Sequence, residues 1–233
     1  QIMLRDSIND QLNRFNGIER ISGRIAYGTN FTPRDCLALK NSLELLPNVK
    51  LLLEATKSSK LKNLYEEVPD FSDVVSLLSN AISDNPPALL SNGGYIREGY
   101  NKELDDYHFA MSDGKKWIID LEQIEREKTG IKNLKIAFNK VFGYYIEVNK
   151  SLAKNVPLTY QRKQTVANNE RYITEELKNL EEKILGAEEN AKKLEQRLFA
   201  ELRNNLISYI PALQKASKII SELDCLVGLA TIA

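Results

Sequence analysis

The chain has 233 residues, of which 42% are hydrophobic and 27% are charged, and its 32 basic and 32 acidic residues balance to a net charge of zero. These values are typical of a soluble globular protein with one or two cores. No apolar stretch approaches the roughly 18 residues that a membrane-spanning helix needs, and the first residues lack the features of a signal peptide. We therefore expect neither a membrane protein nor a secretory leader.

Residues 1–85 predict a series of short helices, because apolar residues recur at helical spacing between short breaks. The clearest helix start is Thr32, an N-cap residue that is followed by Pro33 at the first helical position and Asp35 in the first turn. The other helices expected here lie at residues 6–15, 49–55 and 72–82.

Two long helices with alternating three- and four-residue spacing follow, and an insert separates them. The first runs from residue 102 to 128, before Gly130, and the second from 175 to about 210, after the N-cap residue Thr174. Their apolar seams contain Leu104, Tyr107, Met111, Gly114, Ile118 and Leu121 in the first helix, and Leu177, Leu180, Ile184, Ala187, Ala191, Leu194 and Leu198 in the second. Such seams predict that the two helices pair with each other in antiparallel fashion.

The insert between the long helices changes from helical to alternating periodicity, which predicts β-strands. Leu134, Ile136 and Phe138 alternate with other residues, the stretch from Tyr144 to Val148 does the same, and residues 160–166 predict a third strand. The expected fold is therefore mainly α, with a helical core and long antiparallel helices that carry a small antiparallel β-sheet.

The insert is also basic: residues 131–175 contain eight basic and three acidic residues, so the rest of the chain has an acidic excess. This asymmetry indicates either a local surface that binds a polyanion or a solvated charged loop. Charge alone does not decide between them.

Motifs for catalysis or metal binding are absent from the sequence. There is no GxxxxGK[ST] phosphate loop, one histidine (His108), and two distant cysteines that we interpret as core thiols, Cys36 and Cys225. The acidic pairs at 181–182 and 188–189 are interpreted as solvated helix faces. We expect no enzyme activity and no cofactor in this chain.

Two strings in the insert, 139–148 (NKVFGYYIEV) and 162–173 (RKQTVANNERYI), closely resemble the clamp region of the MutS family of bacterial mismatch-repair proteins. Four flanking segments resemble the same family: 34–40, 96–100, 125–130 and 182–185. The resemblance covers essentially the whole chain, and the two long strings are specific. It implies a helical core at residues 1–100, an outgoing lever helix at 101–130, a clamp at 131–174, and a return lever and core at 175–233.

In the family, two subunits close their clamps around double-stranded DNA and touch its backbone without reading sequence. The resemblance therefore implies a DNA partner, a homodimer in the full-length protein, a downstream partner of the MutL type and a cytoplasmic location. The family's mismatch-reading and ATPase domains are not in this chain. ATP and Mg²⁺ accordingly belong to the full-length family.

The leading candidates for contact with the DNA backbone are Arg162, Lys163 and Asn168, with Gln164 and Thr165 as weaker ones. Lys140, Asn149 and Lys150 would contact or steer DNA from adjoining loops. Alternation predicts that Arg162 and Gln164 face away from Lys163 and Thr165.

Several of these residues have alternative interpretations. Arg162 would instead pair with Glu147 across strands, and Asn168 would form a turn. The aromatic residues of the insert would form its small core rather than a base-stacking platform. A different function is also open: a coiled-coil interaction module whose tip binds a protein.

Overall fold

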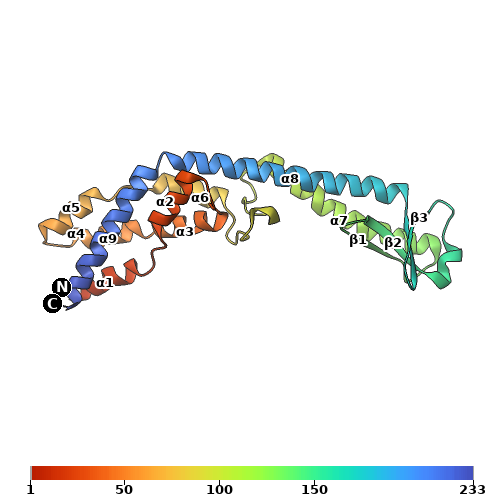
Figure 1. Cartoon of the computed structure of the whole chain (residues 1–233), viewed down its shortest axis with the longest axis horizontal. Helices are drawn as coiled ribbons and strands as arrows, with labels where there is room; N and C mark the ends of the chain where they lie inside the picture. The colour runs from red at the N-terminus through yellow and green to blue at the C-terminus, as the bar shows by residue number, and fades with distance from the viewer. Residues whose placement is uncertain (1, 233) are drawn as a thin grey trace. The chain divides into compact units, whose positions relative to one another are not determined.

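The structure of the chain is a computed structural model that describes residues 2–232. Two compact units are present: one runs to Tyr100 and resumes at Glu195, and the other runs from Asn101 to Leu194. The first is helical, and the second contains a four-stranded antiparallel sheet between long helices (Figure 1). The predicted fold class is confirmed. Within residues 2–232, no helix is both long enough and apolar enough to cross a membrane.

The first unit is built from short helices around a core of leucine and isoleucine side chains. The helices are α1 (Ile2–Leu12), α2 (Ile18–Tyr27), α3 (Pro33–Leu43), α4 (Leu46–Glu54), α5 (Ser59–Glu67), α6 (Ser72–Ala81) and α9 (Ile210–Ile232), with a 3-10 turn, η1, at Leu90–Asn92. The helices expected at 6–15, after Thr32, at 49–55 and at 72–82 are present as α1, α3, α4 and α6, α2 follows the helical spacing of Ile18, Ile21 and Ile25, and α5 is additional. Helix α9 packs against α1 and α2 (Figure 1), and its Leu213 is fully buried. Cys36 is buried as expected, but Cys225 on α9 is exposed, so its interpretation as a core thiol is wrong.

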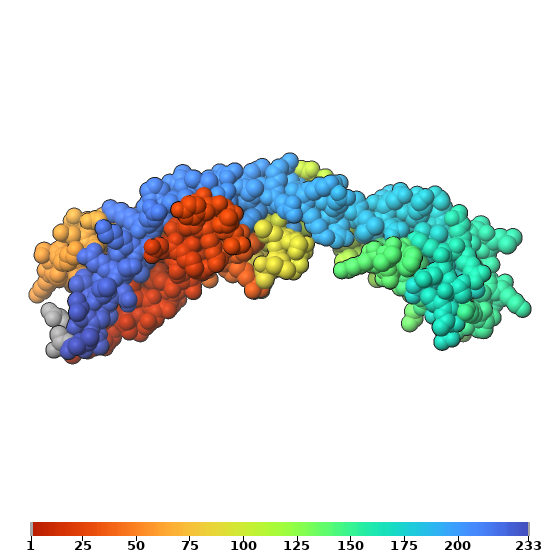
Figure 2. All heavy atoms as spheres, viewed as in Figure 1, coloured from red at the N-terminus to blue at the C-terminus, as the bar shows by residue number. Residues whose placement is uncertain are grey.

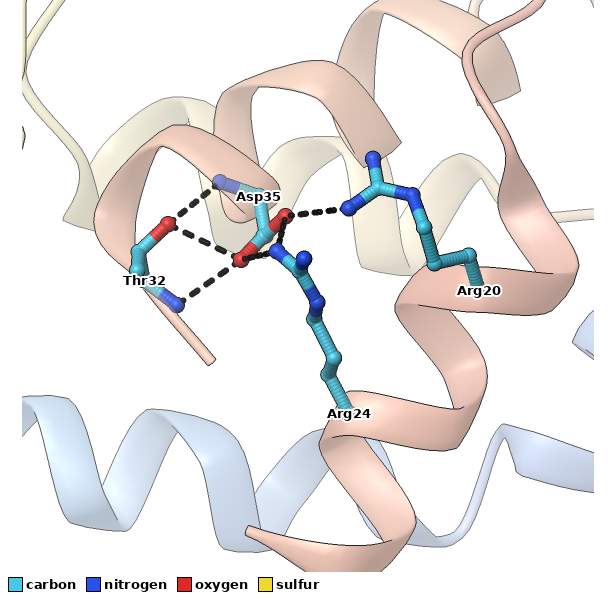
Figure 3. A network of polar contacts seen from close by, with 4 residues as sticks. All are labelled: Arg20, Arg24, Thr32 and Asp35. Atoms are coloured by element: carbon cyan, nitrogen blue, oxygen red, sulfur yellow. Dashed lines mark hydrogen bonds and ion pairs between the residues drawn. The ribbon is translucent and has the colours of Figure 1, made fainter. Parts of the chain in front are cut away.

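The start of α3 is held by the capping box that the sequence predicts. The Asp35 N–H donates to the Thr32 hydroxyl at 3.2 Å, and the Thr32 N–H donates to the Asp35 carboxylate at 3.0 Å. Arg24 donates to the same buried carboxylate at 2.8 Å, and Arg20 lies 3.7 Å from it (Figure 3). These hydrogen bonds and the ion pair with Arg24 offset the free-energy cost of burying the Asp35 carboxylate.

A second buried carboxylate, Glu195, holds the turn at Gly93 and Gly94. It accepts the N–H groups of Gly94, Tyr95 and Ile96 at 2.8, 3.1 and 3.2 Å. Gly93 and Gly94 have positive φ angles of 65° and 76°, and this backbone conformation lets successive N–H groups converge on one anion. The side chain is only 1% exposed, so α8 and this turn are joined inside the first unit.

The long helices are α7 (Lys102–Thr129) and α8 (Glu175–Ile207), close to the predicted bounds. The N-caps are Asn101 and Thr174, and Gly130 ends α7 with a φ of 69°. The expected seam is confirmed in part: its α8 members are all buried, and Ile118 and Leu121 of α7 share one buried cluster with Leu177, Leu180 and Ile184 of the antiparallel α8 (Figure 1). Tyr107 and Met111 of α7 are only partly buried. The two helices approach each other closely at Gly114, because a Cβ there would lie 2.9 Å from Cδ1 of Ile184 and closer still to Cγ1.

The sheet has the strand order β1-β2-β4-β3, and every neighbouring pair is antiparallel. The strands are β1 (Lys135–Asn139), β2 (Gly143–Asn149), β3 (Gln161–Thr165) and β4 (Asn169–Ile173), with a 3-10 segment, η2, at Lys150–Asn155. Sequence alternation predicts three strands and misses β4. Its residues Asn169, Glu170 and Arg171 are polar on both faces, because each face of β4 meets polar partners on the neighbouring strands.

The two faces of the sheet differ in chemistry. The inner face packs Ile146, Val148 and Tyr172 against the seam of α7 and α8 in one cluster with Leu134 and Leu177. The strand register places Lys135, Tyr145, Glu147, Asn149, Gln164, Asn169 and Arg171 on the outer face. The helices thus cover the apolar face, and the outer face is mainly polar, with Arg171 lying over the ring of the buried Tyr145.

Candidate nucleic-acid interface

A β-bulge changes which residues of β3 share a face. Arg162 pairs with Tyr172 and Gln164 pairs with Arg171, so Lys163 is the extra residue between them. Arg162 and Thr165 consequently lie on the same face, and Gln164 lies on the other. The expectation from simple alternation, that Arg162 and Gln164 share a face, is wrong because the bulge inserts one residue into the period.

Arg162 pairs with Glu170, not with Glu147. Its guanidinium lies 3.0 Å from the Glu170 carboxylate, and its Nε donates to the Thr165 hydroxyl at 3.0 Å. The Tyr172 hydroxyl donates to the other Glu170 oxygen at 2.6 Å, and burial, with this hydrogen bond, raises the pKa of Tyr172 to about 12. Arg162 therefore forms a cross-strand ion pair, but its partner is Glu170 on β4 and not the predicted Glu147.

Glu147 instead organises the outer face. It accepts Arg171 Nε at 3.1 Å and Asn169 Nδ2 at 3.0 Å, while Arg171 also donates to the Gln164 amide oxygen at 2.9 Å. The Arg171 guanidinium lies 4.3 Å from the centre of the Tyr145 ring, which is a cation–π distance. Gln164, a candidate for DNA contact, is thus held in a network that spans β2, β4 and β3.

Three predicted candidates meet at the turn between β3 and β4. The Lys150 N–H donates to the Asn168 carbonyl at 3.1 Å, and the Lys150 ammonium donates to the Ala167 carbonyl at 2.8 Å. The Asn149 side chain caps η2 by accepting the Ser151 N–H at 3.0 Å. Asn168 is exposed in the turn, as its alternative interpretation expects. We name this group of Asn149, Lys150 and Asn168 the outer turn.

Two other candidates place their ammonium groups away from the outer turn: Lys140 lies at the opposite end of the sheet, and Lys163 lies in the middle of β3. Lys140 is exposed in the turn between β1 and β2, and the Lys163 ammonium donates to the carbonyl of Phe142 in the same turn. This turn folds back along α8, because the Tyr144 N–H donates to Glu181, six residues after α8 begins. The structure therefore separates Lys140 and Lys163 from the outer turn.

The basic character of the insert comes from six exposed lysines. Both arginines of the sheet are paired with carboxylates, whereas none of these lysines forms an ion pair with any residue from 2 to 232. They are Lys132, Lys135, Lys140, Lys150, Lys154 and Lys163. The single-residue candidates omitted Lys132, Lys135 and Lys154, although the count of basic residues included them. Figure 2 shows the insert, in green to teal, as a projecting end of the second unit.

The aromatic residues divide between core and surface. Tyr145 and Tyr160 are buried, as the core interpretation expects, whereas Phe138 and Phe142 are 47% and 40% exposed. The Phe138 and Tyr144 rings lie 4.9 Å apart, so Phe138 is occupied on one side by its neighbour. The rings therefore do not form one continuous stacking surface.

Glu181 corrects the interpretation of the acidic pairs on α8. Glu182 is exposed, and Glu188 and Glu189 form exposed ion pairs with lysines one turn later, as expected of solvated faces. Glu181, however, is only partly exposed and accepts the Tyr144 N–H at 3.0 Å. Among residues 2–232, no cluster of three or more His, Cys, Asp or Glu side chains is arranged to hold a metal ion.

Comparison with known proteins finds that this chain is similar to members of one family. A family model described as MutS family domain IV matches residues 99–190. The chain is 47% identical over 232 residues to the DNA mismatch repair protein MutS of Alkaliphilus oremlandii, which is 100% of this chain and 26% of that protein. The corresponding proteins of Desulforamulus reducens and Salinibacter ruber are 45% and 44% identical over 100% and 99% of the chain, and 27% and 25% of their own lengths. The chain thus spans about a quarter of these relatives.

Proposed function

This chain belongs to the MutS family as part of a DNA mismatch repair protein, and from this premise we propose that its sheet clamps the backbone of double-stranded DNA without reading sequence. The observation that carries the proposal is the set of six exposed lysines that have no carboxylate partner among residues 2–232. Lysines that replace the counterions of phosphates give affinity that is independent of sequence and falls steeply with salt.

Within this proposal, the outer turn provides the main contacts. Asn149 and Lys150 are fixed there by hydrogen bonds to η2 and to the β3–β4 turn, so their positions are set before DNA arrives. Lys154 on η2 adds a further exposed charge. Lys140 and Lys163, whose ammonium groups lie away from the outer turn, steer the duplex or contact a more distant phosphate.

Arg162, Gln164 and Thr165 remain candidates of a different kind. Arg162 and Thr165 bind each other and Glu170, and Gln164 binds Arg171. A DNA phosphate would have to compete with these partners. We therefore propose that these residues hold the shape of β3, which carries Lys163 and leads into the turn that contains Asn168.

The long helices would connect the clamp to parts of the protein that lie outside this chain. In the full-length family we propose an ATPase domain that uses ATP and Mg²⁺, a homodimer that closes around DNA, a MutL-type partner and a cytoplasmic location. The chain itself has no GxxxxGK[ST] motif, and we propose that it does not hydrolyse ATP. The alternative, a coiled-coil module that binds a protein, gains no support from the relatives' names.

The test is fluorescence anisotropy of a labelled homoduplex with the 233-residue chain across a salt series. The variant combines Lys140→Gln, Lys150→Gln and Lys154→Gln. If each lysine neutralises one phosphate, the slope of log affinity against log salt falls by about 2.7 units, or roughly 40-fold between 50 and 200 mM salt.

The matched control combines Lys57→Gln, Lys62→Gln and Lys218→Gln, three exposed lysines of the first unit. It removes the same charge and should leave the slope unchanged. Equal effects of the two triple variants would show that binding follows net charge rather than the clamp. Wild-type affinity that changes with sequence would also contradict the proposal.

A further inference from the structure

Two carboxylates on the long helices bind backbone N–H groups of the sheet. Glu122 on α7 accepts the Ile136 N–H at 2.7 Å, and Glu181 on α8 accepts the Tyr144 N–H at 3.0 Å. β1 is an edge strand, and β4 pairs with β2 only from Ile146 onward. The helices therefore supply hydrogen-bond acceptors where no neighbouring strand does.

A third carboxylate, Glu125 on α7, ties the chain that enters β3. It is 1% exposed, accepts the hydroxyl of Tyr160, and lies 3.2 Å from the Lys128 ammonium. Burial raises the pKa of Tyr160, and so does its hydrogen bond to Glu125; the phenol therefore remains a donor at neutral pH. Arg126, one residue on, donates from Nε to the Leu134 carbonyl at 2.8 Å.

The contact between the start of β2 and Glu181 requires a glycine at position 143. A Cβ at this position would overlap Oε1 of Glu181 and lie 2.8 Å from its Cδ. The φ angle of 72° also disfavours any residue with a side chain. Glycine is needed here for the backbone to reach the carboxylate.

We infer that Glu122, Glu125 and Glu181 form a carboxylate joint that holds the sheet in one orientation on α7 and α8 and thereby positions the basic surface. Apolar contacts resist separation but have little direction, whereas hydrogen bonds from three different places in the sheet restrain sliding and rotation. The joint deepens the proposed function and rests on it, because a clamp moved by its levers has to move with them.

The orientation of the sheet can be measured directly with spin labels at Lys154→Cys on η2 and Asn190→Cys on α8, both exposed positions of the second unit. Cys225→Ser removes the exposed native thiol, and Cys36 is buried. Double electron–electron resonance then gives the distance distribution between the labels. The chain with Glu122→Ala and Glu181→Ala should give a broader or shifted distribution than the wild type.

Controls separate positioning from folding. Glu122→Gln with Glu181→Gln keeps an oxygen acceptor at each site and should restore a narrow distribution. Glu127→Ala with Glu182→Ala removes one exposed carboxylate from each long helix, near the joint but outside it. This variant should give the same distance distribution as the wild type. If the double alanine variant does not fold, as judged by circular dichroism, Glu181→Ala alone makes the same test. If the chain with Glu122→Ala and Glu181→Ala gave the same distance distribution as the wild type, the inference of a carboxylate joint would be overturned.

The same glutamate substitutions, made without the label sites so that Lys154 is kept, distinguish this inference from the proposed function in the anisotropy assay. Loss of the joint should weaken DNA binding while the salt slope stays unchanged, because the lysines remain but are no longer held in place. A reduced slope in the alanine variant would contradict a positioning role. If the wild-type chain showed no salt-dependent binding but the labels still responded, the clamp proposal would fail and the joint would stand.

Discussion

The two long helices approach each other closely at Gly114. We therefore expect the effect of Gly114→Ala on the free energy of unfolding to change sign when Ile184 is also replaced by alanine. In a helix, alanine is favoured over glycine by roughly 1 kcal/mol. At Gly114, however, a Cβ would lie 2.9 Å from Cδ1 of Ile184 and closer to Cγ1. Overpacking of this kind costs about 1–3 kcal/mol, and a contact this short belongs near the upper end. We therefore expect Gly114→Ala to destabilise the second unit by about 2 kcal/mol.

Ile184→Ala removes both of the atoms that clash. The nearest remaining Ile184 atom is Cβ, which would lie 3.7 Å from the new methyl group, an ordinary contact. In this background, which itself costs about 2–5 kcal/mol, the same Gly114→Ala change should stabilise by roughly 1 kcal/mol through helix propensity. The coupling between the two sites is then about 3 kcal/mol, which is large for a single pair.

Urea denaturation followed by far-ultraviolet circular dichroism measures all four corners of this cycle. The matched control is Gly186→Ala on α8, where a new Cβ would have nothing within 4 Å. It should stabilise by a similar, small amount in both backgrounds. If Gly114→Ala had the same sign and size with and without Ile184, the helices would not be in contact through this pair, and the packing argument would be refuted.

Three further predictions concern the first unit. Glu195→Ala should cost at least about 3 kcal/mol in denaturant, because three N–H groups lose their acceptor at about 1–3 kcal/mol each; Glu195→Gln should cost clearly less, and equal losses would contradict the argument. Asp35→Ala should cost about 3 kcal/mol, since it leaves Arg24 without its buried partner, while the exposed Asp73→Ala should change stability by less than about 1 kcal/mol. Burial raises the pKa of the Cys36 thiol, so a thiol reagent should titrate Cys225 at once and Cys36 only on unfolding; rapid reaction of both would contradict the buried site.

The helical part of this fold is well predicted by sequence because its signals are local. The seam of α7 and α8 repeats every three or four residues, and caps such as Thr32 and Thr174 act within one turn. The sequence even places Gly114 in the seam, although only the structure shows that Ile184 occupies the space. The end of α8 at Ile207 lies close to the predicted 210, and Pro211 follows at the start of α9.

The sheet is less predictable, because its signals come from partners distant in the chain. β4 has no apolar alternation, since Glu170 and Arg171 are satisfied by Arg162 and Glu147 on other strands. The bulge at Lys163 is a matter of register between β3 and β4, and no pattern within β3 specifies it. Faces assigned by period alone were therefore wrong after the bulge.

The site residues are predicted from sequence less well than the helices and better than the sheet. The basic excess of the insert is visible in a count, but the count does not separate a paired cation from an unpaired one. Glu122 and Glu181 look like surface carboxylates of amphipathic helices, and they bind the sheet only because β1 and β2 fold back along those helices. A glycine at the start of β2, where a strand would favour a larger residue, is the one sequence signal that points to Glu181.

The division of charge in the insert follows residue type, and this division supports a clamp that does not read sequence. Arg162 and Arg171 each bind a carboxylate and a second polar side chain within the sheet, a use that suits the planar guanidinium with its several fixed donors. The six lysines form no ion pair within residues 2–232, and the ammonium groups of Lys150 and Lys163 bind only backbone carbonyls, so their charges are available to phosphates. A surface built to read bases would instead leave arginine, asparagine or glutamine free to make paired hydrogen bonds. Here Gln164 and Asn169 are already bound within the sheet, so we expect these two amides not to read bases and the lysines to supply most of the affinity for phosphates.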